Sequence, residues 1–289
     1  MSSTELSDTM DLIIQGGALP TFLLDRIVAA TGATSVEPLP PQVVRLHGVQ
    51  RNDGFDALLP LLEAERLDWA FVASGRRLAD FGLVAFDMDS TLITIECIDE
   101  LADFAGRKHE VAEITEAAMR GELDYRESLR RRLALLAGLD ARVLSRVFEE
   151  RLQLSPGARE LLAAAQASGL RTAILSGGFT YFTERLRIEL GFDFATSNEL
   201  EICGGKLTGR VAGDIVDAAA KAHHLARLRD ELGLRQDQVI AIGDGANDLL
   251  MMAEAGFSLA YRAKPATRAK ASVAFNFVGL DGLLNLFPA

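Results

Sequence analysis

The stretch that most constrains the fold is Leu83–Thr91, where four apolar residues run directly into two aspartates separated by one residue. An apolar run of this kind is typical of a buried strand in a parallel sheet that is covered on both faces. Because charge is costly to bury, Asp87 and Asp89 are expected in the loop beyond the strand, where ligands of open α/β sheets bind. Taken alone, the stretch is equally compatible with a strand that simply ends in an acidic turn.

Two further apolar runs end in polar loops that contain glycine. Arg171–Leu175 leads into Ser176–Gly178, Val239–Ile242 leads into Gly243–Asp248, and Lys221 lies between them on a segment with helical spacing. Because the carboxyl ends of parallel strands meet at one edge of a sheet, three such loops indicate one shared site. Carboxylates, a hydroxyl, an ammonium and glycine N–H groups together suit phosphoryl transfer, with one carboxylate as nucleophile and a hard cation beside it.

Strand-like and helix-like segments alternate along residues 81–289, which predicts an α/β domain with a doubly wound, mainly parallel sheet. Residues 98–151 depart from this alternation because they are patterned as helices throughout. A helical segment inserted directly behind a catalytic loop is well placed to act as a cap that excludes water. Glu199–Ile202 and Leu207–Val211, on either side of two glycines, predict a β-hairpin.

Residues 1–80 are predicted to form a separate small α+β domain, with Asp80–Gly82 as the joint to the domain at 81–289. The segment carries no paired carboxylates and no nucleophile beside a base, which favours a binding or dimerisation role. Its expected order is βαβαβ, with a kink at Pro60. The segments that carry this pattern are Met10–Gln15, Pro20–Thr31, Val43–Leu46, Phe55–Arg66 and Trp69–Ala73.

The net charge of −11 argues against broad nucleic-acid binding, which needs a basic footprint. The same charge would repel an anionic substrate, so the site must supply its own positive charge. No apolar run reaches the length needed to cross a bilayer, and residues 1–11 lack the basic flank and apolar core of an export signal. The two cysteines, Cys97 and Cys203, form no CxxC motif, so a cytoplasmic location is predicted.

The motifs DMDST, SGG, Lys221 and GDGAND resemble, in order and approximate spacing, those of the haloacid dehalogenase (HAD) superfamily. The match covers about residues 83–289 and implies a HAD-like Rossmannoid core with a helical cap. Within it, Glu96, Arg132 and the hairpin ending LTGRV resemble the phosphoserine phosphatases. Members of that family often carry an N-terminal module similar to ACT amino-acid-binding domains, and the pattern in residues 1–80 is compatible with one.

The resemblance implies roles for the motif residues. Asp87 would attack phosphorus and form an aspartyl phosphate, while Asp89 would protonate the departing serine oxygen and later accept a proton from water. Mg²⁺ would be held by an Asp87 oxygen, the Asp89 backbone carbonyl and Asp244, and Asp248 would orient this shell. The transferring phosphoryl oxygens would be bound by Ser176, the Gly177 N–H and Lys221.

Substrate selection is a separate inference from the same resemblance. Glu96 would pair with the serine ammonium, Arg132 with its carboxylate, and Asn247 would reach the substrate or phosphate or shape its turn. Without the resemblance, Arg132 is one of three consecutive arginines on a helix and Glu96 an ordinary acid at a helix start. Met119 and Tyr125 of the cap would face the apolar side of the substrate, although the family pattern leads us to expect Phe at position 125.

These expectations describe a Mg²⁺-dependent phosphatase that hydrolyses O-phospho-L-serine to L-serine and phosphate, the last step of serine biosynthesis. The alternatives are a HAD phosphatase or phosphotransferase acting on another small phosphomonoester, and a catalytically inactive amino-acid sensor. The intact acid set argues against the sensor. A small-molecule substrate is expected, without a nucleic-acid or membrane partner, and a homodimer through the N-terminal domain stays open.

Overall fold

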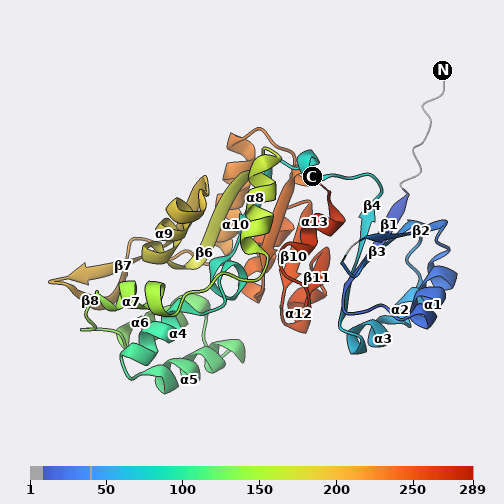
Figure 1. Ribbon diagram of the computed structural model, residues 1–289. Coiled ribbons are helices and arrows are strands. Elements are labelled where there is room, and N and C mark those ends of the chain that lie inside the picture. Colours follow the sequence, from blue (N-terminus) through green and yellow to red (C-terminus); the bar gives the residue numbers. More distant parts are fainter. Residues whose placement is uncertain (1–8, 40, 289) are drawn as a thin grey trace.

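The computed structural model of the chain describes residues 9–39 and 41–288 (Figure 1). Two β-sheets organise these residues, a four-stranded sheet within residues 10–73 and a seven-stranded sheet within residues 83–275. Across the described part of the chain, no helix combines the length and the apolar character that crossing a bilayer would require.

The N-terminal sheet has the order β2-β3-β1-β4, and every neighbouring pair is antiparallel. One face carries Leu12, Ile14 and Leu46, which pack with Leu23, Ile27 and Phe55 of the helices in a single apolar cluster. The elements are β1 (Met10–Gly16), α1 (Thr21–Thr31), β2 (Ser35–Leu39), β3 (Val43–Val49), α2 (Asp53–Asp56), α3 (Leu59–Ala64) and β4 (Leu67–Ala73).

This part of the chain differs from the expected βαβαβ pattern in two places. β2 is a fourth strand and contains Pro38. The proline is tolerated because β2 lies at the edge of its sheet. The helix expected over residues 55–66 is two helices, since Pro60 lies in the first turn of α3 and starts a new helix instead of kinking one.

The larger sheet has the order β11-β10-β9-β5-β6-β7-β8 and is parallel except for β8, which returns as a hairpin partner of β7. The chain moves outward from β5 in one direction and then outward from β9 in the other, so the order of the strands reverses between β5 and β9. Such a reversal opens a crevice at the carboxyl ends of the two strands. The strands are β5 (Leu83–Phe86), β6 (Arg171–Phe179), β7 (Phe194–Cys203), β8 (Lys206–Ala212), β9 (Val239–Gly243), β10 (Phe257–Tyr261) and β11 (Val273–Phe275).

Helices cover both faces of this sheet, which explains why β5 is apolar at every position. Val84 and Phe86 pack in the cluster that includes α8 and α9, whereas Leu83 and Ala85 pack in the cluster that includes α10 and α11. The doubly wound, mainly parallel α/β fold predicted from the sequence is therefore confirmed. The helices are α8 (Ala158–Ala167), α9 (Thr180–Leu190), α10 (Ala218–Glu231), α11 (Leu249–Ala253), α12 (Pro265–Arg268) and α13 (Gly282–Leu286).

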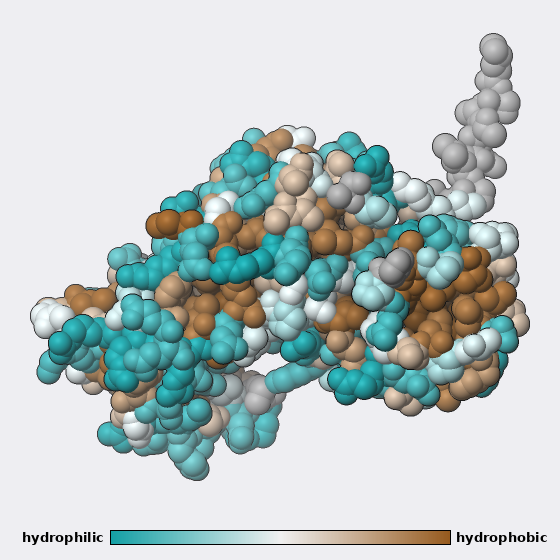
Figure 2. All heavy atoms as spheres, viewed as in Figure 1, coloured by the Kyte–Doolittle hydropathy of each residue, from teal (hydrophilic) through white to brown (hydrophobic). Residues whose placement is uncertain are grey.

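The insertion behind β5 contains α4 (Cys97–Phe104), α5 (Lys108–Met119), α6 (Tyr125–Ala134) and α7 (Val143–Glu150). Figure 1 shows these helices gathered beside the β7–β8 hairpin, and Figure 2 shows that hydrophilic side chains cover most of the visible surface there. Backbone hydrogen bonds join the two parts: the Gly138 N–H donates to the Leu207 carbonyl, and the Leu207 N–H donates to the Leu139 carbonyl. The hairpin is thus a support for the cap.

The second face of the N-terminal sheet packs against the end of the larger domain. Ile13 and Val72 lie in the same apolar cluster as Leu283 and Leu286 of α13. Arg45 reaches across the same boundary and donates to the backbone carbonyls of residues 285 and 286. The small sheet is therefore layered between its own helices and α13 (Figure 1).

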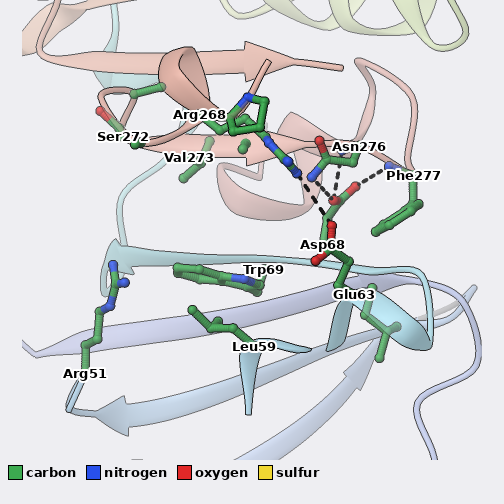
Figure 3. A pocket seen from close by; sticks show the side chains of 15 residues that line it. Arg51, Leu59, Glu63, Asp68, Trp69, Arg268, Ser272, Val273, Asn276 and Phe277 are labelled. Atoms are coloured by element: carbon green, nitrogen blue, oxygen red, sulfur yellow. Dashed lines mark hydrogen bonds and ion pairs between the residues drawn. The ribbon is translucent and has the colours of Figure 1, made fainter. Parts of the chain in front are cut away.

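A cavity of about 430 Å³ lies where β4 approaches β11. Figure 3 shows Trp69 and Leu59 of the N-terminal part on one side and Arg268 and Asn276 on the other, and Arg268 forms a 3.8 Å ion pair with Glu63. The loops that follow β5, β6 and β9 contribute none of its lining residues, so this cavity is separate from the crevice at the strand reversal.

Candidate active site

Asp87 is the first residue after β5 and lies at the strand reversal. Its N–H donates to the Ile242 carbonyl of β9 (2.9 Å), which fixes the residue beside the loop that follows β9. The residue is 4% exposed. Its Oδ1 accepts the Met88 N–H (2.7 Å) and forms an ion pair with Lys221 Nζ (2.8 Å). A carboxylate this deeply buried needs such partners to remain ionised.

Asp89 lies in the tight turn over Met88–Leu92, which reverses the chain immediately after the strand. Ser90 has a φ of +55°, a left-handed conformation that few non-glycine residues adopt and that often marks functional turns. The Asp89 Oδ1 accepts the Cys97 N–H (2.9 Å) at the start of α4. The Asp89 Oδ2 lies so close to Gly178 that a Cβ there would collide with it. Asp89 therefore faces the last residues of β6.

Lys221 joins two of the carboxylates. Its Nζ lies 2.8 Å from Asp87 Oδ1 and 2.7 Å from Asp248 Oδ1, and all three side chains are buried. Burial lowers the pKa of Lys221, but the carboxylates of Asp248 and Asp87 outweigh it and raise the pKa, so the ammonium stays charged. Asp248 Oδ2 accepts the backbone N–H groups of residues 244 and 245, at 3.2 and 3.0 Å, which holds the loop after β9 in place.

The donor set suits a hard divalent cation. Asp87, Asp244 and Asp248 each offer an oxygen, and these oxygens lie within 4.8 Å of one another. Burial and then Asp248 raise the pKa of Asp244 to about 6, and the same two causes raise the pKa of Asp87 well above its usual range. One ammonium therefore leaves negative charge unbalanced in a buried site. Oxygen ligands and surplus negative charge are what Mg²⁺ binding requires.

The Ser176–Gly178 segment lies at the end of β6, beside Asp89. Its sequence, expected as a loop from Ser176 onward, is the continuation of β6 through a bulge between Leu175 and Phe179. The Ser176 Oγ is buried and accepts the Gly178 N–H (2.9 Å). A serine that accepts one hydrogen bond from the protein still has its hydroxyl proton to donate to an anion.

Glu96 precedes α4, and its Oε1 accepts the Ser90 hydroxyl at 2.6 Å. Burial and then the nearby Asp89 raise the pKa of Glu96 to about 8. Arg132 lies in α6, and its Nε is buried without a hydrogen-bond partner. Burial raises the pKa of Asp99, and the positive charge of Arg132 partly offsets this rise. An arginine whose Nε lacks a partner and a carboxyl group with a raised pKa could each bind one end of a zwitterion.

Asn247 and Tyr125 occupy different positions around the site. Asn247 is partly exposed in the short 3₁₀ turn after β9, with its Oδ1 against Gly245. The Tyr125 hydroxyl of α6 donates to the Gly177 carbonyl at 3.1 Å, so the cap contacts the end of β6 directly. The side chain of Met119 lies outside the described part of the structure.

Asn198, which is 1% exposed in β7, was not predicted from the sequence. Its Nδ2 donates to the Gly177 carbonyl (2.7 Å), and its Oδ1 accepts the Val216 N–H (2.8 Å). Nothing in the sequence around it signalled this role, because an asparagine between two strand-like segments is usual in a turn. The Thr91 hydroxyl lies 3.4 Å from Asp244 Oδ1; Thr91 belongs to the DMDST motif, but no role was predicted for it.

Comparison with known proteins identifies relatives of this chain. A family model for haloacid dehalogenase-like hydrolases matches residues 84–253. A phosphoserine phosphatase of Polaromonas sp. is 56% identical over 215 residues, which cover 73% of this chain and 91% of the relative.

Solved structures extend the likeness to the N-terminal sheet. A HAD family hydrolase from Salmonella enterica serovar Typhi superposes with a TM-score of 0.88 at 31% identity, covering 97% of this chain and 99% of that one. An unliganded probable phosphoserine phosphatase from Vibrio cholerae superposes with a TM-score of 0.80 at 40% identity, covering 96% and 85%. Both alignments include nearly the whole chain, so the N-terminal sheet is part of the shared architecture.

Proposed function

The chain belongs to the phosphoserine phosphatases of the haloacid dehalogenase-like hydrolases, and from this we propose that it hydrolyses O-phospho-L-serine to L-serine and phosphate through an aspartyl phosphate on Asp87. The observation that carries the proposal is the buried Asp87 carboxylate at the strand reversal, 2.8 Å from Lys221 and beside Asp244 and Asp248. This reaction would complete the biosynthesis of serine.

In the first step, Asp87 attacks phosphorus and the bond from phosphorus to the serine oxygen breaks. Asp87 Oδ1 already receives the Met88 N–H and Lys221, so Oδ2 is the oxygen best suited to attack. Burial raises the pKa of Asp89, which favours the protonated form that a general acid needs. Asp89 gives this proton to the departing serine oxygen. It then takes a proton from the water that attacks phosphorus and releases Asp87.

The phosphoryl oxygens need fixed donors as charge moves during transfer. We assign this role to the Ser176 hydroxyl, the Gly177 N–H and Lys221, which face the carboxylates from β6 and α10. Lys221 also offsets the charge of Asp87 and Asp248, so it acts on both the nucleophile and the phosphoryl group.

Asp87, the Asp89 backbone carbonyl and Asp244 would hold Mg²⁺, which when bound neutralises charge on the phosphoryl oxygens. Asp248 is near enough to join them, but Lys221 and two backbone N–H groups already occupy its oxygens. We therefore assign Asp248 to orienting Lys221 and the loop that carries Asp244.

Selectivity for phosphoserine would come from the cap side of the site. Arg132 would bind the substrate carboxylate, because its buried Nε lacks a partner. Glu96 would bind the ammonium, which lowers the cost of ionising a carboxyl group whose pKa is raised to about 8. Asn247, at the edge of the crevice, would contact the substrate or phosphate.

The test is steady-state phosphate release across a panel of phosphomonoesters, with and without added Mg²⁺. Phosphoserine should have the highest kcat/KM, hydrolysis should depend on the metal, and Asp87→Asn should abolish it. A higher kcat/KM for a monoester without an α-amino acid group would overturn the substrate assignment. Full activity of Asp87→Asn would overturn the nucleophile. Transfer of the phosphoryl group to an added alcohol would indicate the phosphotransferase instead.

We also propose that residues 1–80 form a dimerisation domain, separate from the catalytic domain at 81–289. Phe22 of α1 and Val36 of the edge strand β2 are 57% and 41% exposed, and Figure 2 shows an apolar area on this part of the molecule. Light scattering should give twice the chain mass for the parent protein. The double variant with Phe22→Ser and Val36→Thr should have a lower mass. The mass of a single chain for the parent protein would contradict the proposal.

A further inference from the structure

The cap helix α6 begins with two residues that contact two different elements of the catalytic domain. Tyr125 donates its hydroxyl to the Gly177 carbonyl of β6 (3.1 Å). Arg126 forms a 2.6 Å ion pair with Asp217 Oδ2, and Asp217 is the N-cap residue of α10, the helix that carries Lys221. Consecutive cap residues therefore reach both elements to which we have assigned phosphoryl binding.

Asn198 links these two elements beneath the cap. Its Nδ2 donates to the same Gly177 carbonyl at 2.7 Å, and its Oδ1 accepts the Val216 N–H at 2.8 Å, one residue before Asp217. The contacts close a ring that runs from α6 through Gly177, Asn198 and Val216 to Asp217 and back to α6. Asn198 is 1% exposed, so water cannot readily replace the partners it provides.

The ring acts on Ser176 through one peptide group. A peptide unit is planar, so the Gly177 carbonyl and the Gly178 N–H turn together. The carbonyl receives Tyr125 and Asn198, and the N–H donates to the Ser176 Oγ at 2.9 Å. Fixing the carbonyl end therefore fixes the donor that orients the Ser176 hydroxyl.

We infer that the Tyr125 hydroxyl is a positioning group that couples the seated cap to the orientation of the phosphate-binding Ser176. The carbonyl has two lone pairs, and Tyr125 supplies the second donor only when α6 lies over the site. A Cβ on Gly177 would collide with this hydroxyl, so glycine is what allows the cap to approach so closely. Phenylalanine at position 125 would fill the same space without this donor.

The inference rests on the proposed role of Ser176 in binding phosphate, so the test measures phosphate binding as well as catalysis. The variants are Tyr125→Phe and the control Tyr181→Phe, which removes the hydroxyl of a tyrosine packed under Arg185 on α9. Isothermal titration gives the Kd of inorganic phosphate in buffer with Mg²⁺. Steady-state assays give kcat/KM for phosphoserine and for p-nitrophenyl phosphate.

For Tyr125→Phe we expect the phosphate Kd to rise about two- to tenfold, the size of one neutral hydrogen bond, and kcat/KM to fall by a similar factor on both substrates. Tyr181→Phe should match the parent. An unchanged phosphate Kd in Tyr125→Phe overturns the inference. A loss confined to phosphoserine also overturns it, because the hydroxyl would then act on the serine part. A parent that binds phosphate but does not hydrolyse phosphoserine contradicts the proposed function, and the phosphate Kd still decides the inference.

Discussion

At the scale of single residues, the site is defined by one cation among several buried carboxylates. Lys221 contacts Asp87 and Asp248 at once, so removing its ammonium would leave both of these buried carboxylates without a cation. An unpaired buried charge costs several kcal/mol, typically about 3–5 when one partner of a pair is removed. The surplus of negative charge makes this part of the molecule a suitable place for a cation.

Replacing Arg132 with alanine should impair phosphoserine hydrolysis selectively. The lost contact is a hydrogen-bonded charge pair with the substrate carboxylate, worth about 1.5–3 kcal/mol, so kcat/KM should fall roughly 10- to 150-fold. Hydrolysis of p-nitrophenyl phosphate, which has no such carboxylate, should change little. The matched control is Arg131→Ala, because Arg131 is exposed on the same helix and pairs with Glu127. Equal losses on both substrates would refute the assignment.

Glu96 should make the folded protein less stable as the pH rises. Its pKa is about 8 in the folded protein against an ordinary value of 4.5, so the folded state binds the proton more tightly. The stabilisation is complete below pH 4.5 and is lost progressively up to about pH 8. Between pH 5 and 8 without metal, the free energy of unfolding in urea should therefore fall more for the parent than for Glu96→Gln. Parallel pH profiles would show that Glu96 does not carry this effect.

Sequence reasoning could propose the carboxylates, Lys221 and Ser176 because each follows a recognisable strand or lies on a recognisable helix. It could not identify Asn198 or the role of the Tyr125 hydroxyl. Both side chains bind the Gly177 carbonyl, and a backbone carbonyl has no signature in the sequence. Only the folded chain brings α6 and β7 to the same peptide group.

At the scale of elements, continuous apolar strands such as β5 were predictable because burial on both faces removes polar alternation. β2 was missed because most of its residues are exposed and it contains Pro38, so it lacks both periodicity and apolar character. β6 was predicted to end four residues too early, since Ser176 and two glycines suggest a loop. A bulge keeps these residues within the strand instead.

The contact between the cap and the hairpin should be sensitive to a single methyl group. Gly209 of β8 has a φ of +84°, and a Cβ there would lie 3.0 Å from both the Ala137 Cβ and the Leu133 carbonyl oxygen. Gly213 has a similar φ of +74° but open space around it, so Gly213→Ala measures backbone strain alone. We expect Gly209→Ala to lower the free energy of unfolding by about 1–3 kcal/mol more than Gly213→Ala. Equal losses in urea denaturation would exclude crowding at this contact.

At the scale of the whole molecule, one carboxylate connects the N-terminal sheet to the far end of the chain. Asp68 of β4 is 2% exposed and accepts the backbone N–H groups of residues 276, 277 and 278 at 2.8–3.0 Å. These bonds bring the edge strand β4 beside β11, the edge strand of the larger sheet. The two parts therefore dock through these side-chain contacts, in addition to the chain connection predicted at residues 80–82.

Asp68→Asn should loosen this docking while leaving the site carboxylates unchanged. An amide can present only one oxygen to the three N–H donors, so we expect a loss of about 1–3 kcal/mol in the free energy of unfolding. Amide hydrogen exchange should increase at residues 276–278. Asp25→Asn, on the exposed surface of α1, is the control. Unchanged exchange at residues 276–278 would mean that Asp68 does not hold the two parts together.

The docking of the small sheet on α13 has a consequence for how the protein is made. Residues 10–73 leave the ribosome first, but the surface that covers Ile13 and Val72 comes from residues near 283–286. About 200 residues of synthesis separate the two, or roughly 10–40 s at typical elongation rates. Throughout this interval, the apolar face that includes Ile13 and Val72 lacks the surface that buries it in the folded protein.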